Sequence, residues 1–212
     1  MRRPVPPLLF LVALAGCSGG SNSGVSGQRP PNVPINMPDA RPSTPATTAE
    51  ERAKLVADRL EQAEAATARK DYSGTIDRLR EAILTEPKDR KVIREMAKAY
   101  QAQALAVASS DPAEAYRSMV SAADYLRTLR DYYPDTTAEE KALAAEIYFN
   151  EATQHAKSLR VEETSGALND AVGAGFSDFD RIRNSPDWKP ILAVPQFKKT
   201  WDDMDKRFPP KK

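Results

Sequence analysis

The 212-residue chain contains a single cysteine and only nine glycines. One cysteine cannot form a disulfide within the chain, so a disulfide framework is excluded. Runs in which β-branched and polar residues alternate, the usual sign of strands, are also missing. Ala, Glu, Lys, Arg and Leu dominate from residue 48 onward, and these residues favour helix. The sequence therefore predicts an all-α protein.

The chain also lacks a strong charge of either sign, with 31 basic and 30 acidic side chains. Residues 1–47 hold four of the basic and one of the acidic groups, which leaves 27 and 29 in the remainder. A nucleic-acid-binding domain normally carries a basic patch. We therefore expect no nucleic acid among the partners.

The sequence also lacks recognisable metal-binding and catalytic motifs. His155 is the only histidine, and no cysteine or second histidine accompanies it to form a metal site. The sequence has no Ser-His-Asp set, no glycine-rich phosphate loop and no zinc-protease motif. We expect no enzyme activity, no metal and no cofactor, and we expect His155 to be a surface or boundary residue.

The first part of the chain has the layout of a secretory signal peptide. Residues 1–17 begin with two arginines, continue with an apolar run at 8–14 and end in small residues before a cysteine. The apolar run is far shorter than the roughly 20 residues that a membrane-spanning helix needs. We therefore expect residues 1–16 to be a signal peptide.

The tetrapeptide Leu14-Ala15-Gly16-Cys17 resembles the lipobox of bacterial lipoproteins. The resemblance implies a diacylglyceryl thioether on Cys17 and cleavage of the Gly16–Cys17 bond. Because each buried methylene contributes about 0.8 kcal/mol, two or three acyl chains would hold the protein at a membrane. In such lipoproteins an Asp after the cysteine retains the protein at the inner membrane, and a serine stands here. This favours the outer membrane of a two-membrane cell, facing the periplasm; the alternative is an ordinary signal peptide with a coincidental cysteine.

Residues 17–47 are rich in Gly, Ser and Pro, a composition that cannot bury a core. We expect a lipidated N-terminus followed by a disordered tether, whose proline half favours an extended spacer. Thr47 and Thr48 are each followed three residues later by glutamate, so they offer overlapping capping boxes. The helical part is therefore expected to begin at residue 48.

Helix signals divide the rest of the chain. Asp111-Pro112 is an N-cap followed by proline at the first helical position, and Thr137 repeats the opening capping signal. Pro87 and Pro134 end helices. Apolar residues recur at three- and four-residue spacings between these points. The predicted helices are 48–69, 73–86, 90–108, 113–133, 137–160, 163–174, 178–184 and 195–207.

An internal repeat indicates how these helices are organised. The segment 70–87 resembles the tetratricopeptide repeat, with an Asp-Tyr turn, a small residue at Ala82 and a closing proline. The spacing of Thr75, Leu79, Ala82 and Ile83 returns in Thr164, Leu168, Ala171 and Val172. A looser, elongated copy lies between Pro87 and Pro134. The resemblance implies a short right-handed α-solenoid of about three helix pairs over residues 48–175.

The last part, residues 176–212, contains both tryptophans and four of the six phenylalanines. It resembles a segment that closes tetratricopeptide arrays in some bacterial proteins. The last repeat of a solenoid exposes an apolar face that must be covered. We therefore expect an aromatic helical cap; the alternative is an aromatic patch that docks a partner.

Tetratricopeptide domains bind peptides in a groove lined by the first helix of each pair. The matching positions on the second such helix are Lys91, Arg94, Lys98 and Gln101, whose spacing places them on one helix face. A basic stripe in a groove would favour an acidic or carboxylate ligand. The alternative is an ordinary solvated face.

These features lead to one functional hypothesis and one alternative. The first is a membrane-anchored envelope lipoprotein that acts as an interaction scaffold for a protein or peptide partner through a helical-repeat groove. The alternative is a structural subunit of an envelope assembly, in outer-membrane biogenesis or cell-wall maintenance.

Overall fold

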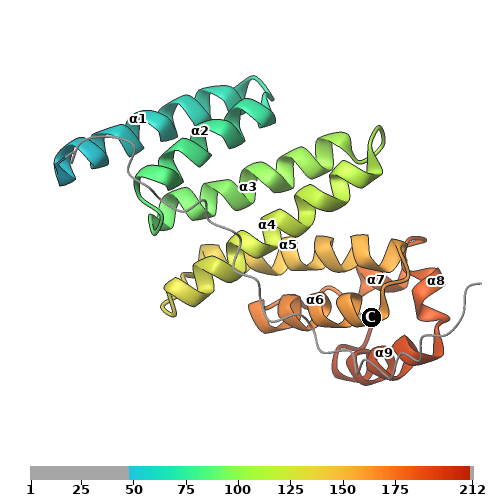
Figure 1. Ribbon diagram of the computed structural model, residues 1–212. Coiled ribbons are helices and arrows are strands. Elements are labelled where there is room, and N and C mark those ends of the chain that lie inside the picture. The colour runs from blue at the N-terminus through green and yellow to red at the C-terminus, as the bar shows by residue number, and fades with distance from the viewer. Residues whose placement is uncertain (1–47, 211–212) are drawn as a thin grey trace, which may run out of the picture. The chain divides into compact units, whose positions relative to one another are not determined.

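A computed structural model of the chain describes residues 48–210, and all regular structure in that range is helical (Figure 1). The predicted all-α class is therefore confirmed for this range. The signal peptide, Gly16, Cys17 and the tether, all predicted within residues 1–47, lie outside the described residues. The helices are α1 (Ala49–Ala68), α2 (Tyr72–Thr85), α3 (Arg90–Val107), α4 (Pro112–Tyr132), α5 (Ala138–Lys157), α6 (Val161–Ala174), α7 (Asp180–Arg183), α8 (Lys189–Leu192) and α9 (Pro195–Arg207).

The helices agree with the sequence-based expectation to within a few residues at most ends, with one omission. Helix α8 was not predicted, because a helix of four residues is too short to show a 3.6-residue apolar pattern. Among the described helices, none combines the length and the apolar character that a bilayer span requires.

Side-chain caps explain where the longest helices begin. The Thr48 hydroxyl accepts the Glu51 N–H at 3.1 Å, and the Glu51 carboxylate accepts the Thr48 N–H at 2.7 Å. Thr137 and Glu140 form the same reciprocal pair, at 3.2 and 2.9 Å, before α5. Both predicted capping boxes are thus present, and each satisfies amide groups that have no partner inside the helix. Asp111 caps α4 as the sequence predicts.

The six long helices before residue 175 pack as three neighbouring pairs. Helix α1 packs on α2, α3 on α4 and α5 on α6, while contacts of α2 with α3 and of α4 with α5 join the pairs in a row (Figure 1). Each of these six helices therefore packs against those of the six that precede and follow it in the chain.

The first and third pairs repeat one another at a constant spacing. Every bound of α5 and α6 lies 89 residues after the matching bound of α1 and α2, as 49 and 138 or 72 and 161 illustrate. The two capping boxes follow the same spacing. The repeat noticed in the sequence therefore extends over two whole helix pairs.

The turn inside each of these two pairs also has the same form. Lys70 and Leu159 both adopt a left-handed backbone, with φ of 60° and 55°. In both turns the next residue donates its N–H to a carbonyl five residues earlier, at 3.0 and 3.1 Å. This bond occupies a carbonyl group at the end of the first helix, which would otherwise lack a partner. The chain then reverses and starts the second helix of the pair.

The C-terminal helices pack on the third pair, with α8 against α5 and α9 against α6. Phe179, Trp188 and Phe197 are almost fully buried there, at 1%, 0% and 0% exposure. The Trp188 ring lies 6.0 Å from that of Phe149 in α5, and its indole N–H donates to the Thr153 hydroxyl at 3.1 Å. These rings belong to the core, as an aromatic cap requires, so they do not form an exposed docking patch.

Candidate functional site

A groove with a volume of about 820 Å³ lies between α1 and α3. Thr75 and Leu79 of α2 contribute to its floor, and its walls include Ala63 of α1 and Ala99 and Ala102 of α3. These small wall residues leave the space between the two helices unfilled. The groove is therefore built by the first helices of two neighbouring pairs.

The rim of this groove carries charges of both signs. Lys91 and Lys98 line it from α3, and Glu61, Glu64 and Glu95 line it from α1 and α3. The Lys98 ammonium lies 3.1 Å from the Glu95 carboxylate. A ligand in the groove would therefore meet alternating positive and negative groups rather than a uniformly basic wall.

The four residues of the predicted basic stripe divide between two sides of α3. Lys91 and Lys98 line the groove, whereas Arg94 lies beside α5, with its guanidinium 3.9 Å from the Glu139 carboxylate. Lys98 also approaches Glu139, at 3.7 Å. Gln101 is partly buried and does not line the groove. The preference for an acidic ligand stays a prediction, now for two lysines that face nearby carboxylates.

Spacing along α3 could have identified one of the groove residues that the sequence analysis omitted. Glu95 follows Lys91 by four residues and precedes Lys98 by three, so all three share one helix face. Glu61 and Glu64 carry no such signal, because their place beside α3 depends on how α1 packs against α2. The charge of the groove was therefore not predictable from α3 alone.

On the far side of α3, an ion pair connects the second pair of helices to the third. The Arg90 guanidinium contacts the Glu140 carboxylate through two hydrogen bonds, at 2.6 and 2.8 Å, and also reaches Asp135 at 3.2 Å. The hydrogen bond from Arg90 lowers the pKa of Glu140 to about 2, against the opposing effect of burial. Glu140 therefore stays ionised while it serves in the capping box of α5.

A second charged cluster lies inside the fold, where α4, α5 and α6 meet. The Arg127 guanidinium holds Glu151 through two hydrogen bonds, at 2.6 and 3.0 Å, and Asp170 at 3.1 Å. Burial favours the protonated form of Glu151, but hydrogen bonds from His155 and Arg127 outweigh it and lower the pKa of this carboxyl. The cluster is a compensated structural network, since each of its charges has an opposite partner.

The expectation that His155 lies at the surface or a boundary is wrong. Its side chain is buried, with one ring nitrogen 3.7 Å from Glu151 and the other 3.5 Å from the Tyr116 hydroxyl. The polar partners that permit this burial come from α4 and α5 together, which the sequence around His155 does not reveal. Within residues 48–210, no group of three His, Cys, Asp or Glu side chains is placed to hold a metal ion.

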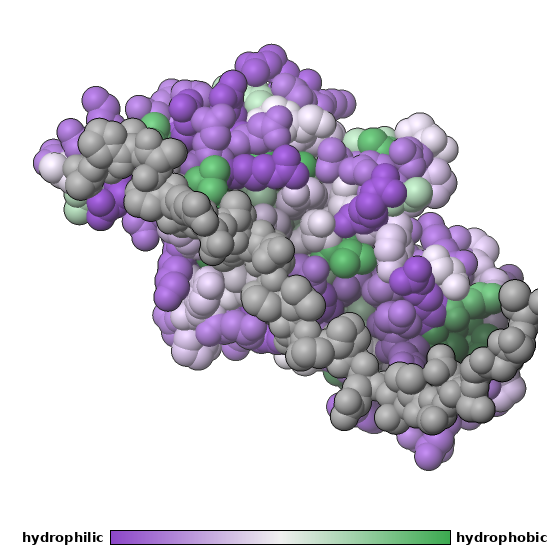
Figure 2. Space-filling view, in the orientation of Figure 1, coloured by the Kyte–Doolittle hydropathy of each residue, from purple (hydrophilic) through white to green (hydrophobic). Residues whose placement is uncertain are grey.

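The surface around these sites is mostly hydrophilic in the face shown in Figure 2, with apolar residues in separate groups. Among residues 48–210, the large apolar side chains that are exposed are Leu55, Leu84, Leu105, Tyr132 and Leu159. They are spread over several helices and turns. Because these exposed side chains do not form one patch, the α1–α3 groove is favoured as an interaction site.

Comparison with protein-family models, curated proteins and solved structures gave no match to the chain. The likenesses to bacterial lipoproteins and to tetratricopeptide repeats therefore rest on the residues named above.

Proposed function

We propose that the chain is a membrane-anchored bacterial envelope lipoprotein that acts as a scaffold for a protein or peptide partner. In this proposal Cys17 carries the lipid, and the three helix pairs form a short right-handed solenoid of the tetratricopeptide type. The lipobox and the Gly/Ser/Pro-rich segment support the anchor. The 89-residue repeat of α1/α2 in α5/α6 supports the solenoid.

The observation that carries the binding function is the groove between α1 and α3. Its volume of about 820 Å³ is within the range of sites that enclose ligands of several hundred daltons, so it can hold a few residues of a peptide. Small alanines on both walls allow a partner backbone to approach closely. Lysines and glutamates on the rim would orient a partner with complementary charges.

A photo-crosslinking residue placed at Ala102, inside the groove, tests this function in intact cells. We expect it to capture a defined envelope protein. The same residue at Ala113, an exposed position at the start of α4, should not capture that protein. The groove proposal fails if both positions capture the same proteins.

A groove-filling variant then tests whether the captured protein binds in the groove. Ala102→Phe should abolish its binding to the purified full chain, and Ala113→Phe should leave it unchanged. Equal binding to both variants would count against the groove. A stable stoichiometric complex together with an envelope defect on deletion would favour the alternative of a structural subunit.

The anchor is tested separately by Cys17→Ser. The variant should remain unprocessed and lose lipid labelling, because serine cannot form the thioether. Unchanged processing and membrane fractionation would overturn the lipoprotein part of the proposal.

A further inference from the structure

A second cavity, of about 220 Å³, lies between α4 and α6. Helix α5 forms its floor. Apolar and small residues account for much of its lining: Leu126, Leu129, Ala144, Gly173 and Ala174. It is separate from the α1–α3 groove and shares no lining residue with it.

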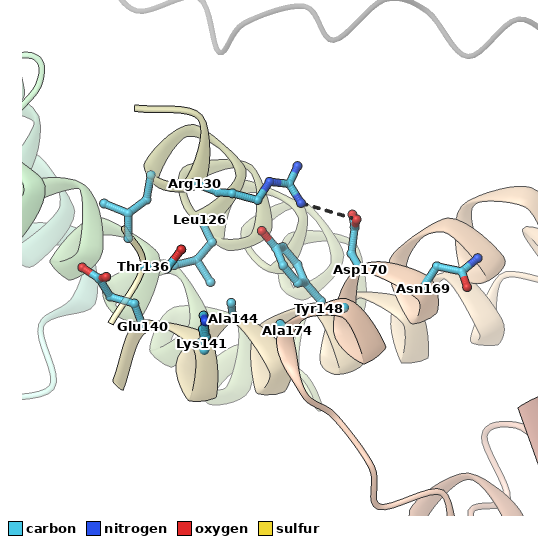
Figure 3. A pocket seen from close by; sticks show the side chains of 12 residues that line it. Leu126, Arg130, Thr136, Glu140, Lys141, Ala144, Tyr148, Asn169, Asp170 and Ala174 are labelled. Carbon is cyan, nitrogen blue, oxygen red and sulfur yellow. Dashed lines mark ion pairs between the residues drawn. The ribbon is translucent and has the colours of Figure 1, made fainter. Parts of the chain in front are cut away.

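Tyr148 of α5 contributes an unpartnered polar atom to this cavity. Its side chain is 2% exposed, and its hydroxyl forms no hydrogen bond with any described residue. Because no fully enclosed side-chain polar atom in the described range lacks a partner, the Tyr148 oxygen must reach the open space of the cavity. Figure 3 shows the ring in the middle of the pocket, with Leu126 on one side and the Arg130–Asp170 pair on the other. With no partner among the described residues, this hydroxyl is available to an acceptor that enters the cavity from outside the chain.

The Tyr148 hydroxyl is a donor under all ordinary conditions. Burial raises the pKa of this phenol, and this effect exceeds the opposing effect of the nearby Arg127. The hydroxyl therefore stays protonated. It can therefore donate a hydrogen bond to an acceptor in the cavity.

The charges around the cavity favour an anion. Its two carboxylates are already engaged, since Glu140 is held by Arg90 and Asp170 by Arg127 and Arg130. In contrast, Lys141 lines the cavity from α5, is exposed, and has no ion-pair partner within the described residues. A positive group that is free to bind thus accompanies the unpartnered donor.

We propose that this cavity binds a carboxylate that bears a short apolar group. The Tyr148 hydroxyl donates to one carboxylate oxygen and the Lys141 ammonium pairs with the anion at the rim. Leu126, Leu129 and Ala144 surround the apolar group. The volume of about 220 Å³ is below that of sites for drug-sized ligands, which suits one residue with an aliphatic side chain. The carboxylate can belong to a free small acid or to the last residue of a peptide, because both present the same chemistry.

Calorimetric titration of the purified full chain tests the proposal with four probes. N-acetyl-leucine should bind, and N-acetyl-leucinamide, which lacks the charge, should bind about tenfold more weakly or worse, as expected for a lost charge-assisted hydrogen bond. A pentapeptide that ends in leucine, compared with its C-terminal amide, identifies a peptide end as the source. Binding of either acid supports the site. The acid that binds more tightly shows whether the carboxylate comes from a small acid or from the end of a peptide.

Matched variants connect that binding to the cavity. Tyr148→Phe keeps the ring and removes only the hydroxyl, so binding should weaken about tenfold, whereas Tyr125→Phe, outside the cavity, should have no effect. Lys141→Gln should weaken binding and reduce its salt dependence, and Lys54→Gln on α1 should not. Gly173 has open space where a side chain would begin. Gly173→Leu should therefore block the cavity, and Gly173→Ala should bind as the wild type does.

Three results would each overturn the proposal. The first is that no probe gives saturable binding in the millimolar range. The second is equal binding of the acid and its amide. The third is wild-type affinity in Gly173→Leu, with circular dichroism showing that the variant is folded.

Discussion

The helix pairs α1/α2 and α5/α6 have the same boundaries at a spacing of 89 residues, the same capping box and the same turn, but different neighbours. In the first pair, Leu60 is partly exposed and lines the α1–α3 groove. Its counterpart Phe149 is 5% exposed and stacks on Phe176, with ring centroids 4.4 Å apart. The α1/α2 pair thus borders a groove, whereas the α5/α6 pair, which has the same helix boundaries, is part of a closed core. What differs is the structure that packs against it.

Polar positions differ in the same way between the two pairs. Glu151 and His155 are buried in the third pair, whereas their counterparts are the exposed Gln62 and the buried Ala66. Helix α4 supplies Arg127 to the third pair. In the described part of the chain no helix precedes α1, so the first pair receives no such partner. Of these two pairs, buried charge is therefore found in the one that α4 flanks on one side and the C-terminal helices flank on the other.

The largest expected difference concerns the aromatic core of the third pair. Phe149→Ala should lower the free energy of unfolding by about 3–5 kcal/mol, because it leaves a cavity among buried rings. Leu60→Ala should cost about 1 kcal/mol, since that side chain is only partly removed from water. Urea unfolding of the full chain measures both. Equal losses would show that Phe149 and Leu60 are equally buried, which would contradict the difference described between the two pairs.

The next effect concerns the buried charge. Glu151→Gln should destabilise the protein by about 2 kcal/mol, since Arg127 keeps a hydrogen bond but loses the most buried of its carboxylate partners. The reverse change in the first pair, Gln62→Glu, adds a charge at an exposed position and should alter stability by about 0.5 kcal/mol or less. Thermal or urea unfolding distinguishes them. If Gln62→Glu lowered the free energy of unfolding as much as Glu151→Gln, the effect at Glu151 could not be attributed to the burial of its charge.

A smaller effect should appear in acid, because the Arg90–Glu140 pair is nearer to solvent, with 29% of the Arg90 side chain exposed against 13% for Arg127. Since folding lowers the pKa of Glu140 from 4.5 to about 2, its contribution is full above pH 4.5 and is lost as the pH falls toward 2. Glu140→Gln should therefore lose less stability than the wild type over that range. Parallel curves for the wild type and Glu140→Gln would contradict the pairing.

The smallest effect concerns the caps themselves. Thr137→Ala should cost about 1 kcal/mol, the usual value for the loss of an N-cap hydroxyl. Thr48→Ala should cost about half as much or less, because the first turn of α1 can fray without opening the rest of the fold. Hydrogen exchange at the two helix starts, together with urea unfolding, measures both. Equal costs would mean that α1 is held at its start as firmly as α5.

Helix positions were predictable because their signals are local. Thr48, Asp111 and Thr137 each cap a helix through a partner three residues away, so the relevant geometry is contained in a few residues. The predicted pairing followed from the repeat around Thr75 and Thr164. The full 89-residue repeat was not recognised, since outside the caps and the small residues the two copies carry different side chains.

The candidate sites were only partly predictable. The basic stripe on α3 was identified, but half of it borders the groove and Arg94 borders α5, because a stripe of three turns reaches two neighbours of the helix. The burial of His155 was missed because its partners come from other turns and helices. No residue near Tyr148 in the sequence indicates that its hydroxyl faces a cavity, because most tyrosines in helical cores have similar neighbours in the chain.

The sequence by itself determined which segments form the long helices, where each of them begins, and that the residues around Thr75 and Thr164 repeat one another. These features depend on backbone hydrogen bonds and caps formed within a few residues. Only the tertiary structure decided which charges line the α1–α3 groove, which aromatic rings pack on the α5/α6 pair, and that Tyr148 faces a cavity. Those outcomes depend on the volumes and charges that distant helices bring to one place, and the side chains of a single helix do not contain that information.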